Sequence, residues 1–293
     1  MNHICCYGEI LWDIFEDKTK IGGAPLNSAL RLKSFENKVE IISAVGNDLL
    51  GDKLISFIKK NGLSTNLILR NSYETGKVFI NLDQDNNAIY DIKKFVAWDF
   101  INLNDQMIRK IKKSNAFIFG SLSARNHESK KTLFKLIEKA SFKVLDVNLR
   151  PPYYNYKTIK KLLVKADFIK FNEEEIIEVS GELGHANKDI MSCVSFISKF
   201  SKTNSICVTK ADKGAILFHE NKFHQHNGFK VKVIDTVGSG DSFLAMLINE
   251  LLNKNDPNKS LKKACAIGAM VATKSGANPE FNKTQIQEFI ESY

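Results

Sequence analysis

The sequence predicts an α/β protein with a mainly parallel central sheet, flanked by helices, and a small β-lid. Short apolar runs rich in β-branched residues alternate with amphipathic helical stretches along most of the chain, which is typical of repeated βαβ units. One region, residues 75–91, breaks this alternation and predicts an antiparallel hairpin. We expect a single domain over residues 1–293, with a lid formed by about residues 10–21 and 72–100.

The strands of the central sheet are predicted from short apolar runs. In chain order these runs are Val39–Val45, Phe117–Phe119, Val144–Val147, Phe168–Phe171, Ile206–Thr209, Ala215–Phe218 and Val231–Ile234. After Gly240, apolar residues recur at the i, i+3, i+4, i+7 and i+8 spacing of a buried helix face. We expect this helix to end near Asn255, just before Pro257.

The lid hairpin is predicted from alternation on both sides of a turn. Val78, Ile80 and Leu82, and then Ile89, alternate with other residues around the turn-like segment Asp83–Asn87. Because this hairpin is inserted between helix-strand units, we expect a small cover and no separately folded domain.

Composition limits the class of protein. The chain of 293 residues is 43% hydrophobic and 26% charged, and it is long enough to bury a substantial core. No stretch approaches the roughly 18 consecutive apolar residues of a membrane span, and Met1–Cys6 lack the features of a signal peptide. We therefore expect a cytoplasmic protein that does not bind membranes.

The charge and the cysteines point to no special partner. The lysine surplus behind the net charge of +9 is spread along the chain, so solvated lysines explain it as well as a phosphate ligand does. The absence of a clustered basic stripe or a recognised module argues against nucleic-acid binding. The five cysteines show no C-x-x-C spacing, which argues against a zinc site.

The segment from Asp235 to Asp241, Asp-Thr-Val-Gly-Ser-Gly-Asp, carries the strongest chemical signal. Its small residues let the backbone approach a ligand closely, and a helix N-terminus directs free N–H groups at an anion. Asp241 would lie in the first helical turn, where a carboxylate can accept a hydroxyl proton. The same four letters, Gly-Ser-Gly-Asp, also form common loops and helix caps. Neither a Walker-type loop nor a dinucleotide-binding turn is present.

Polar residues also follow directly after several predicted strands. Asp146 lies at the end of one predicted strand, Asn148 and Arg150 follow it, and Asn172 and Glu175 follow the next. In an open parallel sheet such positions share one edge, where ligands bind. Polar residues collected at this edge predict a binding site.

Further motifs occur in the same order along the chain. They are Gly8-Glu9-x-x-x-Asp13, Gly22-Gly23-Ala24-Pro25-Leu26-Asn27, Val45-Gly46-Asn47-Asp48-x-x-Gly51, Asp146-x-Asn148-x-Arg150 and Asn172-Glu173-x-Glu175. Together with the segment ending at Asp241, they resemble the ribokinase-like (PfkB) carbohydrate kinases from Gly8 to Pro279. This resemblance implies a ribokinase-like fold and an ATP-dependent sugar kinase that uses Mg²⁺; it leaves open a monovalent cation and a homodimer formed through the lid.

The resemblance also implies roles for individual residues. Asp241 would be the catalytic base, beside an anion hole formed by Gly238, Ser239 and Gly240. The residues expected to bind the sugar are Asp13, Gly22, Gly23, Asn27, Asn148 and Arg150. The residues expected on the nucleotide side are Thr209, Gly214, Gly238, Gly276 and Ala277. Glu175 and Asn172 are expected to hold Mg²⁺ through water, although Asn-Glu-Glu-Glu is also a good helix start. Arg125 is expected either to line the same cleft or to be a surface arginine.

The substrate is predicted from finer similarities. Ala24, where ribokinases usually carry Lys, and Val96–Asp99 resemble fructokinases, so D-fructose is the first choice. The alternative sugar is 2-keto-3-deoxygluconate, whose kinases share the Asp-x-Asn-x-Arg motif. A catalytically silent regulatory homologue is the alternative of another class. The family usually has Gly at the positions of Glu36, Ala211 and Met246, and none of these departures removes a reactive group.

Overall fold

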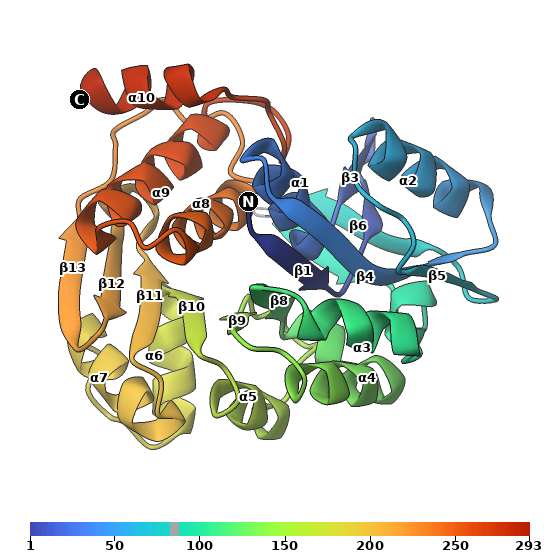
Figure 1. Ribbon diagram of the computed structural model, residues 1–293, viewed down its shortest axis with the longest axis horizontal. Helices are drawn as coiled ribbons and strands as arrows, with labels where there is room; N and C mark the ends of the chain where they lie inside the picture. The colour runs from blue at the N-terminus through green and yellow to red at the C-terminus, as the bar shows by residue number, and fades with distance from the viewer. Residues whose placement is uncertain (83–87) are drawn as a thin grey trace.

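The computed structural model describes residues 1–82 and 88–293. Within those residues a nine-stranded sheet, ordered β13-β12-β11-β10-β9-β8-β1-β4-β5, forms the centre of the molecule, with helices on both faces (Figure 1). Its strands are β1 His3–Tyr7, β4 Lys38–Gly46, β5 Ile68–Asn71, β8 Ala116–Gly120, β9 Lys143–Asp146, β10 Phe168–Asn172, β11 Ser205–Thr209, β12 Ala215–His219 and β13 Lys222–His226. The pairs from β5 through β11 are parallel, whereas β12 and β13 pair antiparallel. The predicted α/β fold class is confirmed.

Two apolar cores lie on opposite faces of this sheet. Cys5 and Tyr7 of β1 belong to one core, and Ile4 and Cys6 belong to the other, as the alternation of side chains along a strand requires. The first core is covered by α3 Asp105–Lys112, α4 His127–Ile137, α5 Tyr156–Leu163, α6 Glu173–Glu182 and α7 Ile190–Ser201. The second contains residues of α1 Ala24–Ser34, α2 Leu49–Lys60, α8 Ser239–Leu252, α9 Pro257–Ala272 and α10 Lys283–Glu291.

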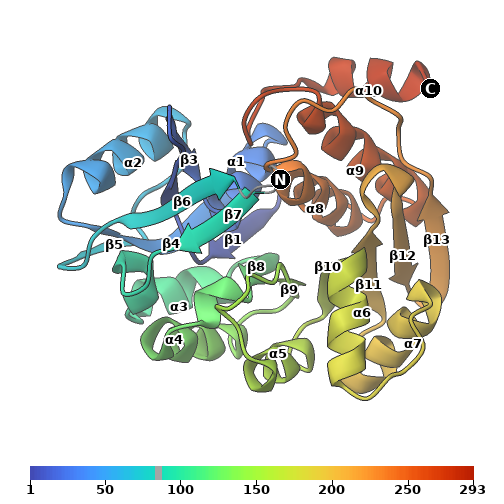
Figure 2. The ribbon, with the colours of Figure 1, turned by 180° about the vertical axis from the view of Figure 1, so that it is seen from behind.

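A second, four-stranded sheet is built from two separate stretches of the chain. Its order is β3-β2-β6-β7, with β2 Leu11–Ile14, β3 Thr19–Gly22, β6 Gly76–Leu82 and β7 Ala88–Ile92. The predicted hairpin is present as the antiparallel pair β6 and β7, and its predicted turn, Asp83–Asn87, lies outside the described residues. Figure 2 shows β6 and β7 in front of the central strands. The small sheet is thus built from the two segments predicted for the lid, and its action as a lid stays a prediction.

One predicted strand is wrong. Val231–Ile234 forms no strand, and the edge strand is β13, which follows β12 after Glu220 and Asn221. The antiparallel partner of β12 is thus taken before the chain reaches Val231. Val233 and Ile234 are instead 55% and 63% exposed. The following helix is confirmed, since α8 ends at Leu252, three residues before the expected position. Among the described residues, no helix combines the length and the apolarity that a membrane span needs.

Candidate functional site

A polar cavity of about 280 Å³ lies where the sequence predicts a binding site. β9 and β10 end beside it, and β2 and β6 of the small sheet contribute Asp13 and Val78 to its wall. Its polar lining residues are Glu9, Asp13, Asn27, Asp146, Asn148, Arg150, Lys170, Thr236 and Asp241. Residues that are far apart in the sequence thus meet at one edge of the parallel sheet, between the two sheets.

The glycine-rich turn at one end of this cavity starts helix α8. Gly238 has a left-handed backbone, with φ of 78°, and a Cβ there would lie 2.5 Å from the carbonyl oxygen of Ala277. Only glycine fits this position. The hydroxyl of Ser239 donates to the carbonyl of Gly268 at 2.8 Å. Because N–H groups in the first turn of a helix lack intrahelical acceptors, this turn can bind an anion.

Asp241 follows this turn and is held in place by a chain of amides. The Nδ2 of Asn27 donates to Oδ2 of Asp241 at 2.8 Å, and the Nδ2 of Asn278 donates to Oδ1 of Asn27 at 2.8 Å. Burial and the nearby Asp146 carboxylate raise the pKa of Asp241 to about 6, although the Asn27 hydrogen bond and nearby cations act in the opposite direction. A carboxylate with this pKa is suited to accept a proton near neutral pH.

Lys170 places a buried positive charge below the turn. Its Nζ donates to Oδ1 of Asp146 at 2.8 Å, and a Cβ on Gly240 would lie 3.7 Å from that Nζ. Burial acts to lower the pKa of Lys170, but the carboxylates of Asp146 and Glu175 outweigh it, so the pKa is raised. Lys170 therefore stays charged close to the anion-binding turn.

Asp13 lies across the cavity on the small sheet, opposite Lys20 in the neighbouring strand. Burial raises the pKa of Asp13 to about 6, although Lys20 and Arg150 act to lower it. Gly22 and Gly23 fit closely around this side of the cavity, since a Cβ on Gly22 would lie 2.2 Å from Oδ2 of Asp13. Gly23 has φ of 113°, and it lines the cavity, whereas Gly22 is close to Asp13 but is not among the lining residues.

A second cavity, of about 780 Å³, lies on the other side of the turn. It is largely apolar, and it shares Thr236 and Gly240 with the polar cavity. Its walls include Thr209, Ala211, Gly214, Gly228, Phe229, Val231, Val233, Phe243, Cys265, Ala269 and Ala272. The glycine turn thus separates a small polar space from a large apolar one.

Gly276 and Ala277 brace the turn from outside this second cavity. The N–H of Gly276 donates to Oδ2 of Asp235 at 3.0 Å, and Ala277 packs against Gly238. Oδ2 of Asp235 also accepts a hydrogen bond from Nζ of Lys20, in the small sheet, at 3.1 Å. Their expected contact with a nucleotide stays a prediction, because of the expected nucleotide-side residues only Thr209 and Gly214 line the large cavity.

Asn172 and Glu175 form a reciprocal cap at the start of α6. Oδ1 of Asn172 accepts from the N–H of Glu175, and Oε2 of Glu175 accepts from the N–H of Asn172, both at 2.8 Å. Oε1 of Glu175 accepts from the N–H of Leu149 at 2.8 Å. The structure thus shows the helix-start interpretation directly, while magnesium binding stays a prediction. The described residues contain no group of three or more His, Cys, Asp and Glu side chains placed to hold a metal ion.

Comparison with known proteins decides the family. The model of the pfkB family carbohydrate kinases matches residues 1–284.

This chain belongs to the pfkB family of carbohydrate kinases.

A fructokinase from Vibrio alginolyticus is 26% identical over 315 residues, covering 99% of both chains. The structure of a fructokinase from Xylella fastidiosa with bound ATP superposes with a TM-score of 0.87 at 21% identity, covering 99% of this chain and 98% of that one. A fructokinase from Vibrio cholerae O395, in a form with fructose, ADP and calcium, has a TM-score of 0.85 at 23% identity and covers 99% of each chain. These structures show the ribokinase-like fold.

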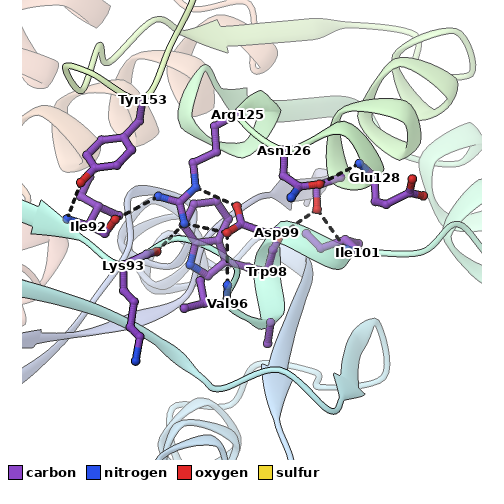
Figure 3. A network of polar contacts seen from close by, with 12 residues as sticks. Ile92, Lys93, Val96, Trp98, Asp99, Ile101, Arg125, Asn126, Glu128 and Tyr153 are labelled. Atoms are coloured by element: carbon purple, nitrogen blue, oxygen red, sulfur yellow. Dashed lines mark hydrogen bonds and ion pairs between the residues drawn. The ribbon is translucent and has the colours of Figure 1, made fainter.

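Arg125 matches neither of its two expected positions in this pfkB protein. It is not among the described residues that line the polar cavity, and its side chain is only 7% exposed. The guanidinium pairs with both oxygens of Asp99, donates to the carbonyls of Ile92 and Lys93, and stacks on Trp98 at 4.0 Å (Figure 3). Arg125 therefore anchors the end of β7 to the body of the protein.

Two of the departures from the family pattern occupy backbone conformations that favour glycine. Glu36, between α1 and β4, has φ of 65°, and Ala211 has φ of 50°. Met246 instead lies buried within α8. Glu36 and Ala211 therefore cost backbone energy where glycine would not, and they do not change the lining of the polar cavity.

Two residues that line the polar cavity, Lys170 and Glu9, were not predicted as site residues from the sequence. A lone Lys within the apolar strand Phe168–Asn172 was the available signal, because a buried lysine needs a carboxylate partner. The motif Gly8-Glu9-x-x-x-Asp13 predicts a role for Asp13 and none for Glu9. In the structure it is 5% exposed and lines the polar cavity.

Proposed function

We propose that this carbohydrate kinase transfers the γ-phosphoryl group of ATP to a hydroxyl group of a small sugar, with D-fructose as the preferred acceptor. The observation that carries this proposal is the glycine turn between two cavities, with Asp241 on the side of the small polar one. The relatives named fructokinase support the choice of fructose, as does the Vibrio cholerae structure with fructose and ADP.

In the proposed reaction, Asp241 accepts the proton of the sugar hydroxyl as its oxygen attacks the γ-phosphorus. The bond between that phosphorus and the bridging oxygen breaks, and ADP leaves with the electron pair. The N–H groups at the start of α8 and the charge of Lys170 stabilise the negative charge on the transferred group. Asn27 positions Asp241 and holds it in its ionised form through their hydrogen bond.

The sugar would lie in the polar cavity. Asp13, Asn148 and Arg150 line it and offer both acceptors and donors to hydroxyl groups. The small sheet supplies Asp13, so its closure over the sugar would also exclude water, which otherwise competes for the phosphoryl group.

The nucleotide would lie in the large apolar cavity, where Thr209 and Gly214 lie beside the apolar walls. Glu175 and Asn172 would hold Mg²⁺ through water, since carboxylate and amide oxygens suit this hard cation. When bound, Mg²⁺ would neutralise charge on the nucleotide phosphates. Calcium in one Vibrio cholerae fructokinase structure supports a divalent cation, and potassium in another supports a monovalent one.

Arg150 favours a second acceptor, 2-keto-3-deoxygluconate. Its guanidinium lines the polar cavity, and the only hydrogen bond that it donates within the described residues goes to the carbonyl of Leu149. A guanidinium with free N–H groups is suited to bind a carboxylate.

The direct test is ADP release from Mg-ATP with a panel of D-fructose, D-ribose, 2-keto-3-deoxygluconate, tagatose and nucleosides. We expect turnover with fructose that is lost in Asp241→Asn and kept in the control Asp52→Asn, an exposed carboxylate paired with Arg70. Turnover with 2-keto-3-deoxygluconate alone would select the second acceptor. No turnover with any compound would contradict the proposal and favour a catalytically silent homologue.

A further inference from the structure

Glu9 is a buried carboxyl group whose hydrogen bonding is incomplete. It follows β1 and is 5% exposed, and its Oε2 has no hydrogen-bond partner among the described residues. Leaving a buried polar group without a partner is costly, so native proteins rarely do it without a reason. Glu9 also lines the polar cavity. A ligand in that cavity is therefore a natural source of the missing partner.

The backbone around Glu9 fixes its position. Gly8 has φ of 139°, and a Cβ on Gly23 would lie 2.4 Å from the carbonyl oxygen of Glu9. The two glycines thus let the chain bring Glu9 under the loop that starts α1. This packing fixes the backbone of Glu9 at the wall of the polar cavity.

The charges of the cavity favour a neutral ligand. Glu9, Asp13 and Asp241 contribute carboxyl groups, and the guanidinium of Arg150 acts electrostatically on all three. The charge of Lys170 is already paired with Asp146. Lys20 also acts on Asp13, and Arg125 also acts on Glu9, but these two cations are paired with Asp235 and Asp99. Because Arg150 has no such carboxylate partner among the described residues, three carboxyl groups face one guanidinium that is not in an ion pair, and a ligand carboxylate in their midst would be repelled.

A hydroxyl group suits Glu9 in either protonation state. Burial raises the pKa of Glu9 to about 7, with Arg150 acting to lower it and Asp241 acting to raise it. A hydroxyl can donate to a carboxylate or accept from a carboxylic acid. A ligand carboxylate can only accept.

We propose that Glu9 binds a hydroxyl group of the acceptor, and that it is a specificity residue which makes this site prefer an uncharged polyhydroxylated sugar over a sugar acid. This inference rests on the proposed kinase function and names the class of its substrate.

The test compares Glu9→Leu and Glu9→Gln with the wild type, using D-fructose and 2-keto-3-deoxygluconate as acceptors and ADP release as the readout. Loss of a hydrogen bond to a carboxyl group should lower kcat/KM for fructose by about 10- to 100-fold in Glu9→Leu. KM for ATP should change less than about twofold, because only sugar binding is lost. Glu9→Gln keeps hydrogen-bonding atoms but loses the charge, so its loss should be smaller, and its preference for fructose over the sugar acid should fall at least about threefold.

Glu40→Gln is the matched control. Glu40 is also a buried glutamate with an unpartnered Oε2 among the described residues, but it lies in β4 and pairs with Lys110, away from the polar cavity. The Glu40→Gln variant should leave the preference for fructose over 2-keto-3-deoxygluconate unchanged. An equal effect of Glu40→Gln and Glu9→Gln would contradict the inference.

The outcomes separate this inference from the proposed function. If the wild type phosphorylates fructose but Glu9→Leu keeps kcat/KM within about threefold, the function stands and the role of Glu9 is wrong. If Glu9→Leu fails to fold, the near-isosteric Glu9→Gln decides by its acceptor preference. If the wild type phosphorylates no sugar, the proposed function fails, and the role of Glu9 fails with it.

Discussion

The anchor of β7 by Arg125 gives a prediction for stability. The perturbation is Arg125→Met, which keeps an unbranched apolar stem and removes the guanidinium with its charge. Asp99 is 1% exposed and loses both of its contacts to the guanidinium, while the carbonyls of Ile92 and Lys93 lose a donor. Removing one member of a buried ion pair costs about 3 to 5 kcal/mol, because the other charge stays buried without compensation.

The assay is equilibrium unfolding in guanidinium chloride, with the free energy of unfolding as the readout. The second substitution, Asp99→Asn, removes the stranded charge and can keep the acceptor for the N–H of Val96. The double variant should therefore be more stable than Arg125→Met alone. In the control Arg70→Met, the partner Asp52 is 63% exposed, and the loss should be below about 1 kcal/mol. A loss below 1 kcal/mol for Arg125→Met, or a double variant no more stable than the single one, would refute this reasoning.

Three further predictions concern the pH profile, the backbone and the nucleotide cavity. Because the proposed base must be ionised and the pKa of Asp241 is about 6, kcat/KM should fall as pH drops through about 6; a flat profile between pH 5 and 8 would contradict this. Glu36→Gly should raise the free energy of unfolding by about 0.5 to 1 kcal/mol, because glycine adopts the positive φ at this position without strain. The control Lys33→Gly, within α1, should lower the free energy of unfolding by a similar amount. A change of the same sign in both variants would argue against backbone strain at Glu36. Ala269→Trp should fill part of the large cavity and weaken ATP binding at least about tenfold in calorimetry, with sugar binding unchanged; weakened sugar binding alone would reverse the two cavities.

Much of the fold was predictable because it depends on local patterns. Local patterns predicted the helix α8, from its apolar face, and five strands, from their apolar and β-branched runs: β4, β8, β9, β10 and β11. Val231–Ile234 shows where this fails: its β-branched residues favour a strand, but the edge of β12 is already paired with β13. Strand propensity does not reveal whether a partner is free.

The sequence predicted which residues lie at the candidate site better than it predicted the contacts between them. The rule that ligands bind at the carboxyl ends of parallel strands predicted that Asp146, Asn148 and Arg150 lie together, and all three line the polar cavity. Asp241 lines the same cavity, although the strand predicted before its turn, Val231–Ile234, is absent. The sequence did not predict that Asn27 bonds to Asp241, or that Glu175 places both oxygens on backbone N–H groups. Such contacts depend on side-chain positions across elements that are distant in the sequence.

The central claim is that Asp241 is the base of a sugar kinase whose glycine turn separates sugar from nucleotide. The measurement that tests it most directly is steady-state ADP release with fructose for the wild type and Asp241→Asn, together with ATP affinity by calorimetry. We predict that kcat falls by about 10² to 10⁴ while ATP affinity changes less than about twofold. Full turnover in Asp241→Asn would contradict the account.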